Sequence, residues 1–376
     1  MRICFLIIGL FVSGAVVEGA VDQDVLTLVQ QVAPMRIDSD VKRLVAFETR
    51  FMGSDSNAAA SVWLGQRLAG LGYTVRYDTF EVNTPTRSFF GHTFSVTGLK
   101  QWNVIATKRG SLFPNKKVVL GGHYDSISID RAQKDQDVAP GADDNASGIA
   151  AVLEIARLMQ PVNVDMTIEF AFWGAEELGL IGSDYYAKQA KAKGEEIVVM
   201  LQLDAIGTRS PVFPNGFTID TINPYVMQGN VLAQAAVDYS SVEALNGVGG
   251  QVFVSSRGCG CSDHQSFINV GYPALGIFQY INSPSSHLNM SIDTLDHVDV
   301  SFVAGITQAT LGALLQFAGF PGRSADFDGD GRVAFGDFLL FAQAFGAQIF
   351  DVRFDLDKDN VVGFGDFLIF ASAFGQ

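Results

Sequence analysis

Hydrophobic residues recur along the chain with two different spacings, one typical of helices and the other of strands. Residues 22–87 show mostly the helical spacing, in which apolar positions three and four residues apart share one face. The second stretch of this kind ends at Gly72, which is typical of a helix C-terminus. Two apolar faces are predicted, one formed by Val41, Leu44, Val45 and Phe47 and the other by Val62, Leu64, Leu68 and Leu71.

Further along, segments of strand length alternate with helical ones. Residues 73–82 alternate like a strand, and residues 117–122, 166–173 and 197–203 resemble buried strands. A helical pattern spans residues 149–159, between the first two of these apolar runs. Such alternation predicts an α/β layered sheet covered on both faces, in which ligands bind beyond the carboxyl ends of the strands.

The first twenty residues have the pattern of a secretory signal peptide. Arg2 gives a positive start, residues 3–17 are apolar but too short for a membrane span, and Gly19 and Ala20 suit cleavage. We therefore expect residues 1–20 to be removed and the mature protein to be secreted, either extracellular or periplasmic. An uncleaved N-terminal anchor is the alternative. No later stretch reaches about 18 uninterrupted apolar residues, so no membrane association is expected after cleavage.

Composition and charge narrow the class of protein. Of the 376 residues, 48% are hydrophobic and 30 are Phe, which allows a substantial core. The net charge is −15, and so acidic a surface repels the phosphates of nucleic acids and anionic lipids. The length predicts one large domain at residues 21–320 and a small one at residues 321–376, after a joint at 320–324.

Residues with metal-binding chemistry follow the predicted strands. The segment 121–126 reads Gly-Gly-His-Tyr-Asp-Ser, and Asp125 is placed to accept a hydrogen bond from the ring N–H of His123, fixing the tautomer that ligates. Residues 140–148, Pro-Gly-Ala-Asp-Asp-Asn-Ala-Ser-Gly, place carboxylates in a turn of small residues. The pair Glu176 and Glu177, like Asp204, follows a strand; adjacent buried carboxylates repel unless a cation lies between them or one is protonated.

These motifs resemble those of the co-catalytic zinc exopeptidases of the bacterial leucine-aminopeptidase type, over roughly Val41 to Phe317. The resemblance implies a three-layer sandwich with a mixed, mostly parallel central sheet, and two Zn²⁺ ions per catalytic domain. It assigns His123 and Asp204 to different ions and makes Asp144 the bridge between them. It makes Glu177 a zinc ligand and Glu176 the general base.

The resemblance also implies a residue that supports the site and a last ligand. Asp125 matches an acid behind the ligands. His287 matches the last zinc ligand because it precedes Asp-Thr-Leu at 293–295, although the spacer is about two residues longer than in the family; His297 is the alternative. His264, in Ser-Asp-His, matches a motif that lines the site.

The implied activity is that of an aminopeptidase, in which Glu176 takes the proton from the attacking water and passes it to the leaving amine. Residues 205–207 with Phe278 and Tyr280 suggest an apolar side-chain pocket, although core packing explains them equally well. The alternatives are a carboxypeptidase or glutaminyl cyclase of the same fold, or a binding protein without catalysis. Cys259 and Cys261 are closer together than the paired cysteines of relatives, so whether they are bonded stays open.

The last 55 residues contain a repeat with the spacing of a calcium-binding EF-hand loop, with acids at positions 1, 3, 5 and 12. Each copy is followed by a Phe-rich segment that ends in Ala-Phe-Gly. Asp at position 12 resembles dockerin modules, which implies an all-α module that needs Ca²⁺ to fold and a possible cohesin-like partner. The predicted calcium ligands are Asp326, Asp328, Asp330, Arg332 (carbonyl) and Asp337, then Asp355, Asp357, Asp359, Val361 (carbonyl) and Asp366.

Overall fold

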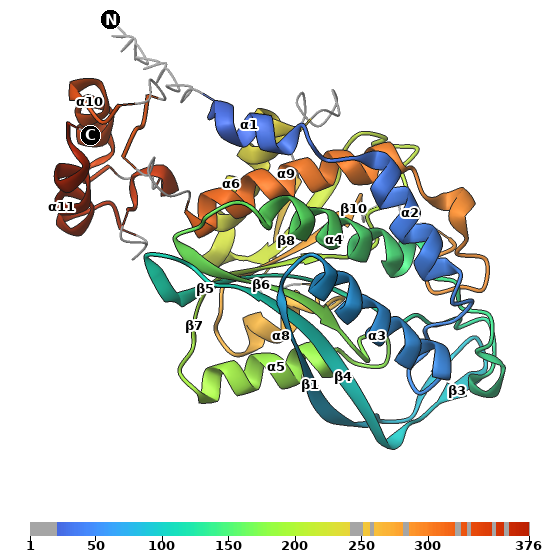
Figure 1. Cartoon of the computed structure of the whole chain (residues 1–376). Coiled ribbons are helices and arrows are strands. Elements are labelled where there is room, and N and C mark those ends of the chain that lie inside the picture. Colours follow the sequence, from blue (N-terminus) through green and yellow to red (C-terminus); the bar gives the residue numbers. More distant parts are fainter. Residues whose placement is uncertain are drawn as a thin grey trace, which may run out of the picture.

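A computed structural model of the chain is shown in Figure 1. It describes residues 21–240, 251–255, 259–280, 286–319, 325–328, 332–347, 351–356 and 361–375. The predicted signal peptide and three predicted calcium ligands, Asp330, Asp357 and Asp359, lie outside these ranges.

An eight-stranded mixed sheet forms the centre of the molecule, in the order β1-β4-β6-β5-β7-β10-β8-β9. Its middle strands β6, β5, β7 and β10 are mutually parallel. β4 runs antiparallel to both of its neighbours, whereas β8 runs antiparallel to β10 and parallel to β9. The predicted mixed sheet is confirmed. The strands are β1 (Thr74–Asn83), β4 (Thr97–Lys108), β5 (Phe113–His123), β6 (Met166–Trp173), β7 (Glu196–Leu203), β8 (Phe217–Ile222), β9 (Gln251–Ser255) and β10 (Ala274–Gln279), with β2 (Arg87–Phe89) and β3 (His92–Phe94) in a separate hairpin.

Helices cover both faces of this sheet (Figure 1). Side chains alternate along β5, so Val118 and Leu120 join the larger core with α1–α4, α6 and α9, whereas Val119 joins a smaller core with α5 and α8. Every residue of β6 is buried, as expected for a strand enclosed on both faces. The helices are α1 (Gln23–Val29), α2 (Pro34–Val45), α3 (Asp55–Gly70), α4 (Gly148–Met159), α5 (Ile181–Ala192), α6 (Val226–Tyr239), α8 (His264–Asn269) and α9 (Val300–Ala318).

Most of the predicted elements are found within a few residues of their expected bounds, but one predicted apolar face is partly wrong. Val62 is 49% exposed, because α3 buries Ala60, Ser61, Leu64 and Leu68 instead. The helix begins after its N-cap residue, Ser54, whose side chain accepts a hydrogen bond from the backbone N–H of Asn57 in the first turn.

One helix among the described residues, α9, is long and apolar enough to cross a membrane by length and composition. In the structure 83% of that apolar stretch is buried, and α9 packs along α6. Asp299 caps its first turn by accepting the N–H groups of Ser301 and Phe302. The helix therefore contributes to the core of the α/β body.

The C-terminal repeat forms two short helices, α10 (Phe335–Ala344) and α11 (Phe364–Ala373). Its buried cluster consists of Ala325, Val333, Leu356 and Phe370, and the ring of Phe341 stacks on that of Phe370. The first turns match across the repeat: Asp337 accepts the N–H of residue 334, and Asp366, 29 positions later, accepts that of residue 363.

Candidate metal centre

Four of the predicted site residues meet at the carboxyl ends of three neighbouring parallel strands. His123 is the last residue of β5, Asp204 directly follows β7, and Glu176 and Glu177 follow β6 after a short turn. Because β5 lies between β6 and β7 in the sheet, these strand ends converge. His123 is 1% exposed, and Glu176 and Asp204 are almost as deeply buried.

The ring of His123 lies at the middle of this cluster. Its Nε2 atom is 3.1 Å from Oδ1 of Asp144 and 3.3 Å from Oδ1 of Asp204. Two overlapping groups of donor atoms could each hold a metal ion: His123 with Asp144 and Asp204, and His123 with Glu176 and Glu177. The expectation that His123 and Asp204 bind different ions is corrected, because their donor atoms converge on one position with Asp144.

The loop that carries Asp144 is fixed by hydrogen bonds from distant parts of the chain. The carboxylate of Asp293 accepts the backbone N–H groups of both Asp143 and Asp144, at 3.0 and 2.9 Å. The side chain of Asn145 donates to the carbonyl of Leu203 at the end of β7 and accepts the N–H of Ala205. Asp144 is therefore positioned by the same strand end that carries Asp204.

A buried arginine supports this loop from below. The guanidinium of Arg50 is fully buried and donates to four backbone carbonyls, those of residues 44, 124, 140 and 141. Burial lowers the pKa of Arg50 to about 10, and the nearby carboxylates, Asp293 foremost, oppose that shift. The guanidinium remains charged at neutral pH and adds one positive charge beneath the acidic site.

The carboxylate of Asp125 binds the backbone of the two glutamates rather than the ring of His123. Its carboxylate oxygens accept the backbone N–H groups of Glu176 and Glu177, at 3.0 and 3.2 Å. The ring Nδ1 of His123 instead hydrogen-bonds the backbone carbonyl of Asp125 at 3.2 Å, and the carboxylate lies 3.8 Å away. The predicted ring-to-carboxylate hydrogen bond is therefore wrong, because the turn after β6 engages both carboxylate oxygens.

The electrostatics of the cluster indicate a cation site. Burial and the neighbouring negative charges raise the pKa values of Glu176 and Glu177 well above the usual range. Burial would lower the pKa of His123, but the charges of Glu176 and Asp204 raise it well above its ordinary value. A divalent cation would relieve this repulsion.

The donor set fits zinc. It combines one imidazole with carboxylate oxygens, which are ligands that zinc prefers. Among the described residues, Oε1 of Glu177 is buried without a hydrogen-bond partner. A buried carboxylate oxygen of this kind is expected at a position where a cation binds.

The predicted last ligand, His287, lies beside this cluster but belongs to neither group of donor atoms in the described chain. Its Nε2 atom is 3.0 Å from Oδ2 of Asp143 and 3.2 Å from the hydroxyl of Thr208. Its ring stacks on that of His297, the alternative ligand, with 4.0 Å between ring centroids. Zinc ligation by His287 stays a prediction.

A cavity of about 310 Å³ opens onto the cluster. The residues first suggested as an apolar pocket do not line it: Ile206 is buried in the main core, and Phe278 packs edge-on against His264. Its lining residues are Arg87, His123, Asp144, Glu176, Glu177, Gly179, Leu180, Asp204, Gly260, Cys261 and Asn289.

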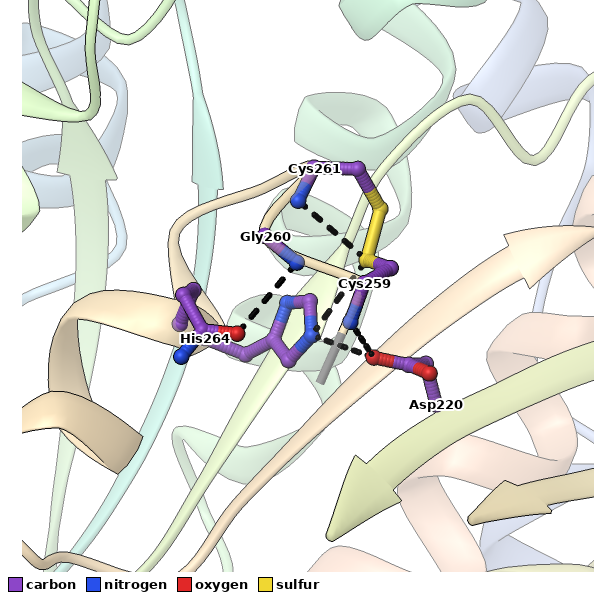
Figure 2. Close-up of a disulfide and its surroundings, with 6 residues drawn as sticks. Asp220, Cys259, Gly260, Cys261 and His264 are labelled. Carbon is purple, nitrogen blue, oxygen red and sulfur yellow. Dashed lines mark hydrogen bonds and ion pairs between the residues drawn. A yellow bond between two sulfur atoms is a disulfide. The ribbon is translucent and has the colours of Figure 1, made fainter. Parts of the chain in front are cut away.

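The two cysteines at the cavity edge are bonded to each other, which answers the question that the sequence left open (Figure 2). His264, expected to line the site, is fully buried beside Cys259 and hydrogen-bonds Asp220 at 3.0 Å. Its ring therefore does not reach the cavity.

Several supporting residues were not found from the sequence. Arg50 belongs to none of the motifs. Asp293 is part of the Asp-Thr-Leu motif, which indicated only that His287 is a better match for a zinc ligand than His297. Asp263 accepts a hydrogen bond from Gln202, which in turn accepts one from Trp173. Burial raises the pKa of Asp263 to about 7. The Ser-Asp-His motif was the only sequence signal for Asp263.

The chain is similar to known proteins in both sequence and structure. Residues 103–313 match peptidase family M28. "Probable leucine aminopeptidase" of Arthroderma otae is 27% identical over 286 residues, covering 74% of this chain and 71% of that protein. Among solved structures, the aminopeptidase of Aneurinibacillus sp. strain AM-1 is similar at a TM-score of 0.63 and 18% identity, covering 79% of this chain and 96% of that one. Glutaminyl cyclase of Porphyromonas gingivalis is similar at a TM-score of 0.61 and 21% identity, covering 75% of this chain and 97% of that one.

The two structures show the fold, and they confirm the predicted α/β sandwich. The predicted enzyme class, a zinc metallo-aminopeptidase, is confirmed by the family match together with the aminopeptidase relatives. Because the match covers more than half of the residues, the chain belongs to peptidase family M28.

Proposed function

We propose that this M28 enzyme is a secreted aminopeptidase that uses two zinc ions and prefers apolar N-terminal residues. The observation that carries the proposal is the convergence of Asp144, Glu176, Glu177 and Asp204 around His123 at the bottom of one cavity. Buried carboxylates this close together are rarely tolerated without a bound cation.

Five residues would hold the metal. His123 and Asp204 would bind one ion, Glu177 and His287 the other, and Asp144 would bridge both. When bound, the ions would supply Lewis-acid polarisation of the peptide carbonyl and acidify the attacking water.

Glu176 is the proposed general base. It lines the cavity, is almost fully buried, and its backbone is fixed by the carboxylate of Asp125. Its carboxylate would take a proton from the attacking water and return it to the leaving amine. A general base must be held at a fixed position relative to the attacking water, and the hydrogen bond to Asp125 helps to hold Glu176 in place.

The preference for the amino end of a peptide rests on the aminopeptidase relatives. Among the described residues, four carboxylates line the cavity, together with the imidazole of His123 and the guanidinium of Arg87. Two bound zinc ions would offset the charge of these carboxylates, so charge alone does not select the amino end. The preference for apolar side chains rests on the leucine aminopeptidase relative and on Leu180, which is the only aliphatic side chain among the described residues of the lining.

The testing experiment compares substrates that differ only at the N-terminus. The purified enzyme, with its zinc content measured, is given a leucyl peptide with a free amine, the same peptide acetylated, and one that begins with glutamine. Cleavage of the free-amine peptide alone, with two zinc ions per chain, supports the proposal. Hydrolysis of the acetylated peptide from its carboxyl end, or cyclisation of the glutamine, would point to the other activities of this fold instead.

The C-terminal repeat is proposed as a calcium-binding module of the dockerin type. Carboxylate oxygens of Asp326, Asp328 and Asp337 lie within 4.8 Å of one another, as a shared ion requires. Calorimetric titration of the calcium-free protein should count two ions. A count of zero would remove this part of the proposal.

A cohesin-like partner is proposed for the same module. Its helices expose apolar side chains at positions equivalent across the repeat, a duplicated surface that suits a protein partner. These pairs are Phe335 and Phe364, Leu339 and Leu368, and Phe345 and Phe374. Purified cohesin domains, immobilised and titrated with the calcium-loaded protein, should bind it; no binding across such a panel would argue against this partner.

Secretion follows from the N-terminal pattern of the sequence. N-terminal sequencing of the protein recovered from culture medium should begin close to Val21. An intact Met1 on cell-associated protein would favour the uncleaved anchor.

A further inference from the structure

The disulfide between Cys259 and Cys261 (Figure 2) lies at the edge of the cavity that a peptide substrate would enter, because Cys261 lines that cavity. Gly260 and Cys261 line the same cavity as His123 and Glu176, and both cysteines are exposed. A thiol that enters the peptide cavity therefore meets a disulfide within it.

The two sulfur atoms have different surroundings. Sγ of Cys259 lies 3.8 Å from Nε2 of His264 and 3.3 Å from the backbone N–H of Cys261, which donates to it. Asp220 holds this arrangement together, because its Oδ2 atom contacts Nε2 of His264 at 3.0 Å and accepts the N–H of Cys259 at 2.9 Å. The N–H donor and the imidazole stabilise a thiolate at Cys259, and the Asp220 carboxylate, within 4.8 Å of its Sγ atom, opposes them. Because Cys261 is the cysteine that lines the cavity, Cys261 is the sulfur to be attacked and Cys259 the leaving group.

Opening this bond costs the fold little. A disulfide stabilises a protein mainly by restricting the unfolded chain, and that effect is smallest when the closed loop is short. Here a single residue, Gly260, separates the cysteines. Apart from its two chain neighbours, no atom of the described residues lies within 4 Å of the position that a Cβ on Gly260 would occupy, so the turn has room to rearrange.

We propose that the Cys259–Cys261 disulfide is a thiol-exchange site that reversibly blocks the peptidase. The thiolate of a monothiol attacks Sγ of Cys261, the sulfur–sulfur bond breaks, and Cys259 leaves as a thiolate beside His264. The product is a mixed disulfide on Cys261 and one free thiol on Cys259, with no net change in oxidation state. The group attached to Cys261 then occupies the cavity until the Cys259 thiolate displaces it.

The exchange can be tested by mass alone, without activity. The full chain carrying Cys4→Ser, which leaves this pair as its only cysteines, is treated with 2-mercaptoethanesulfonate and then alkylated with iodoacetamide. We expect one thiol adduct and one alkyl group per chain, with the adduct on Cys261 at about tenfold excess over Cys259. No adduct, or an even distribution between the two cysteines, overturns the proposal.

The role of His264 is tested by rate. His264→Gln should slow adduct formation about tenfold at neutral pH, while the melting temperature of the disulfide form stays unchanged. Asp220→Asn provides a second test if the first variant does not fold. Wild-type rates in both folded variants would contradict the role given to the imidazole.

The proposed inhibition of hydrolysis by the adduct rests on the proposed peptidase activity, so it is measured in a separate experiment. Hydrolysis of a leucyl substrate should fall in proportion to the adduct and return when a dithiol removes it. In Cys259→Ser/Cys261→Ser the thiol should leave the rate of hydrolysis unchanged relative to that of the same variant before treatment. An adduct without loss of hydrolysis removes the blocking role. An enzyme that hydrolyses nothing even before treatment contradicts the proposed function, while the mass experiment still reports on exchange.

The source of the thiol is distinguished by a matched peptide pair. A peptide with N-terminal cysteine should form the adduct faster than a free monothiol of similar acidity if the cavity presents it to Cys261. Equal rates for the two would assign the exchange to small thiols in solution. The corresponding N-terminal serine peptide should leave the mass unchanged, and a mass change with it would show that the adduct is not a disulfide.

Discussion

Two regions of this chain gather carboxylates, and they do so on scaffolds of very different size. The acids around His123 stand at the ends of strands in an eight-stranded sheet enclosed by helices. Asp326 and Asp328 lie in a loop and Asp337 lies in the first turn of the short helix α10, next to a cluster of four buried apolar residues. The first scaffold has an extensive core of its own, and the second has almost none.

The difference lies in what a bound ion is needed for. In the α/β body, hydrogen bonds from Asp125, Asn145 and Asp293 already fix the segments that carry the acids. An ion there is needed for chemistry. In the C-terminal module the acids lie beside a core too small to hold them together, so the proposed calcium ions would be needed for folding. Removing one ligand should therefore have opposite consequences in the two regions.

The sharpest test in the α/β body is Glu176→Gln. The amide keeps the shape of the side chain but cannot take a proton, so kcat should fall about a thousandfold while zinc content and melting temperature stay at the wild-type values. Steady-state hydrolysis of a leucyl substrate measures the fall. Glu196→Gln, at an exposed glutamate, serves as the matched control. Full activity in Glu176→Gln would show that another group is the base.

The second test removes the support under Asp144. Arg50→Met leaves four buried carbonyl acceptors without their donor and should cost about 3 kcal/mol of unfolding free energy. Denaturant unfolding measures the loss, with exposed Arg36→Met as the control. If Arg50→Met were as stable as that control, Asp293 and Asn145 would hold the loop without Arg50, and the contrast with the C-terminal module would be weaker.

Parts of this site were predictable because they depend on short-range pattern. A run of strand-forming residues followed by a polar side chain predicts both the strand and the end of it at which that side chain lies. The sequence therefore predicts His123, Glu176, Glu177 and Asp204 as site residues without the order of the strands in the sheet. Their convergence follows from the parallel order of β6, β5 and β7.

The rest depends on contacts between segments far apart in the sequence. Arg50 bonds carbonyls of residues 44, 124, 140 and 141, and no local pattern marks it. The partners of Asp125 are backbone N–H groups 51 and 52 positions away, so the residue was identified and its contact was not. Val62 was misplaced because α3 buries small residues, which carry little hydrophobic signal.

Asp125 and Asp337 allow a direct comparison, because each accepts backbone N–H groups through both carboxylate oxygens. Asp125→Asn turns one acceptor into a donor that faces an N–H group, so it should lower zinc affinity and kcat/KM by about tenfold to a hundredfold. Competition with a zinc chelator measures the affinity. Exposed Asp137→Asn is the control, and equal affinities in the two variants would show that Asp125 does not position the glutamates.

The matching change in the small module is Asp337→Ala. One calcium ion should be lost, and hydrogen exchange should quicken about tenfold within residues 332–347, while kcat/KM changes less than twofold. Exchange monitored by mass spectrometry reports the two regions in one experiment. Asp351→Ala, at a partly exposed residue outside both predicted calcium loops, should leave exchange within residues 332–347 unchanged. A loss of peptidase activity in Asp337→Ala would show that the two regions are coupled.

The smallest effect concerns a buried acid that the protein neutralises without any ion. Burial alone would raise the pKa of Glu169, but hydrogen bonds and charges from Arg76 and Lys117 hold it below its usual 4.5. A carboxyl with a lowered pKa contributes stability above 4.5 that is lost as the pH falls through its folded-state value. Acidification should therefore cost wild type about 2 °C more in melting temperature than it costs Arg76→Met/Glu169→Gln, with or without chelator. If chelator changed this difference, the pair would be linked to the metal centre, and the protein's own cations would not suffice to neutralise Glu169.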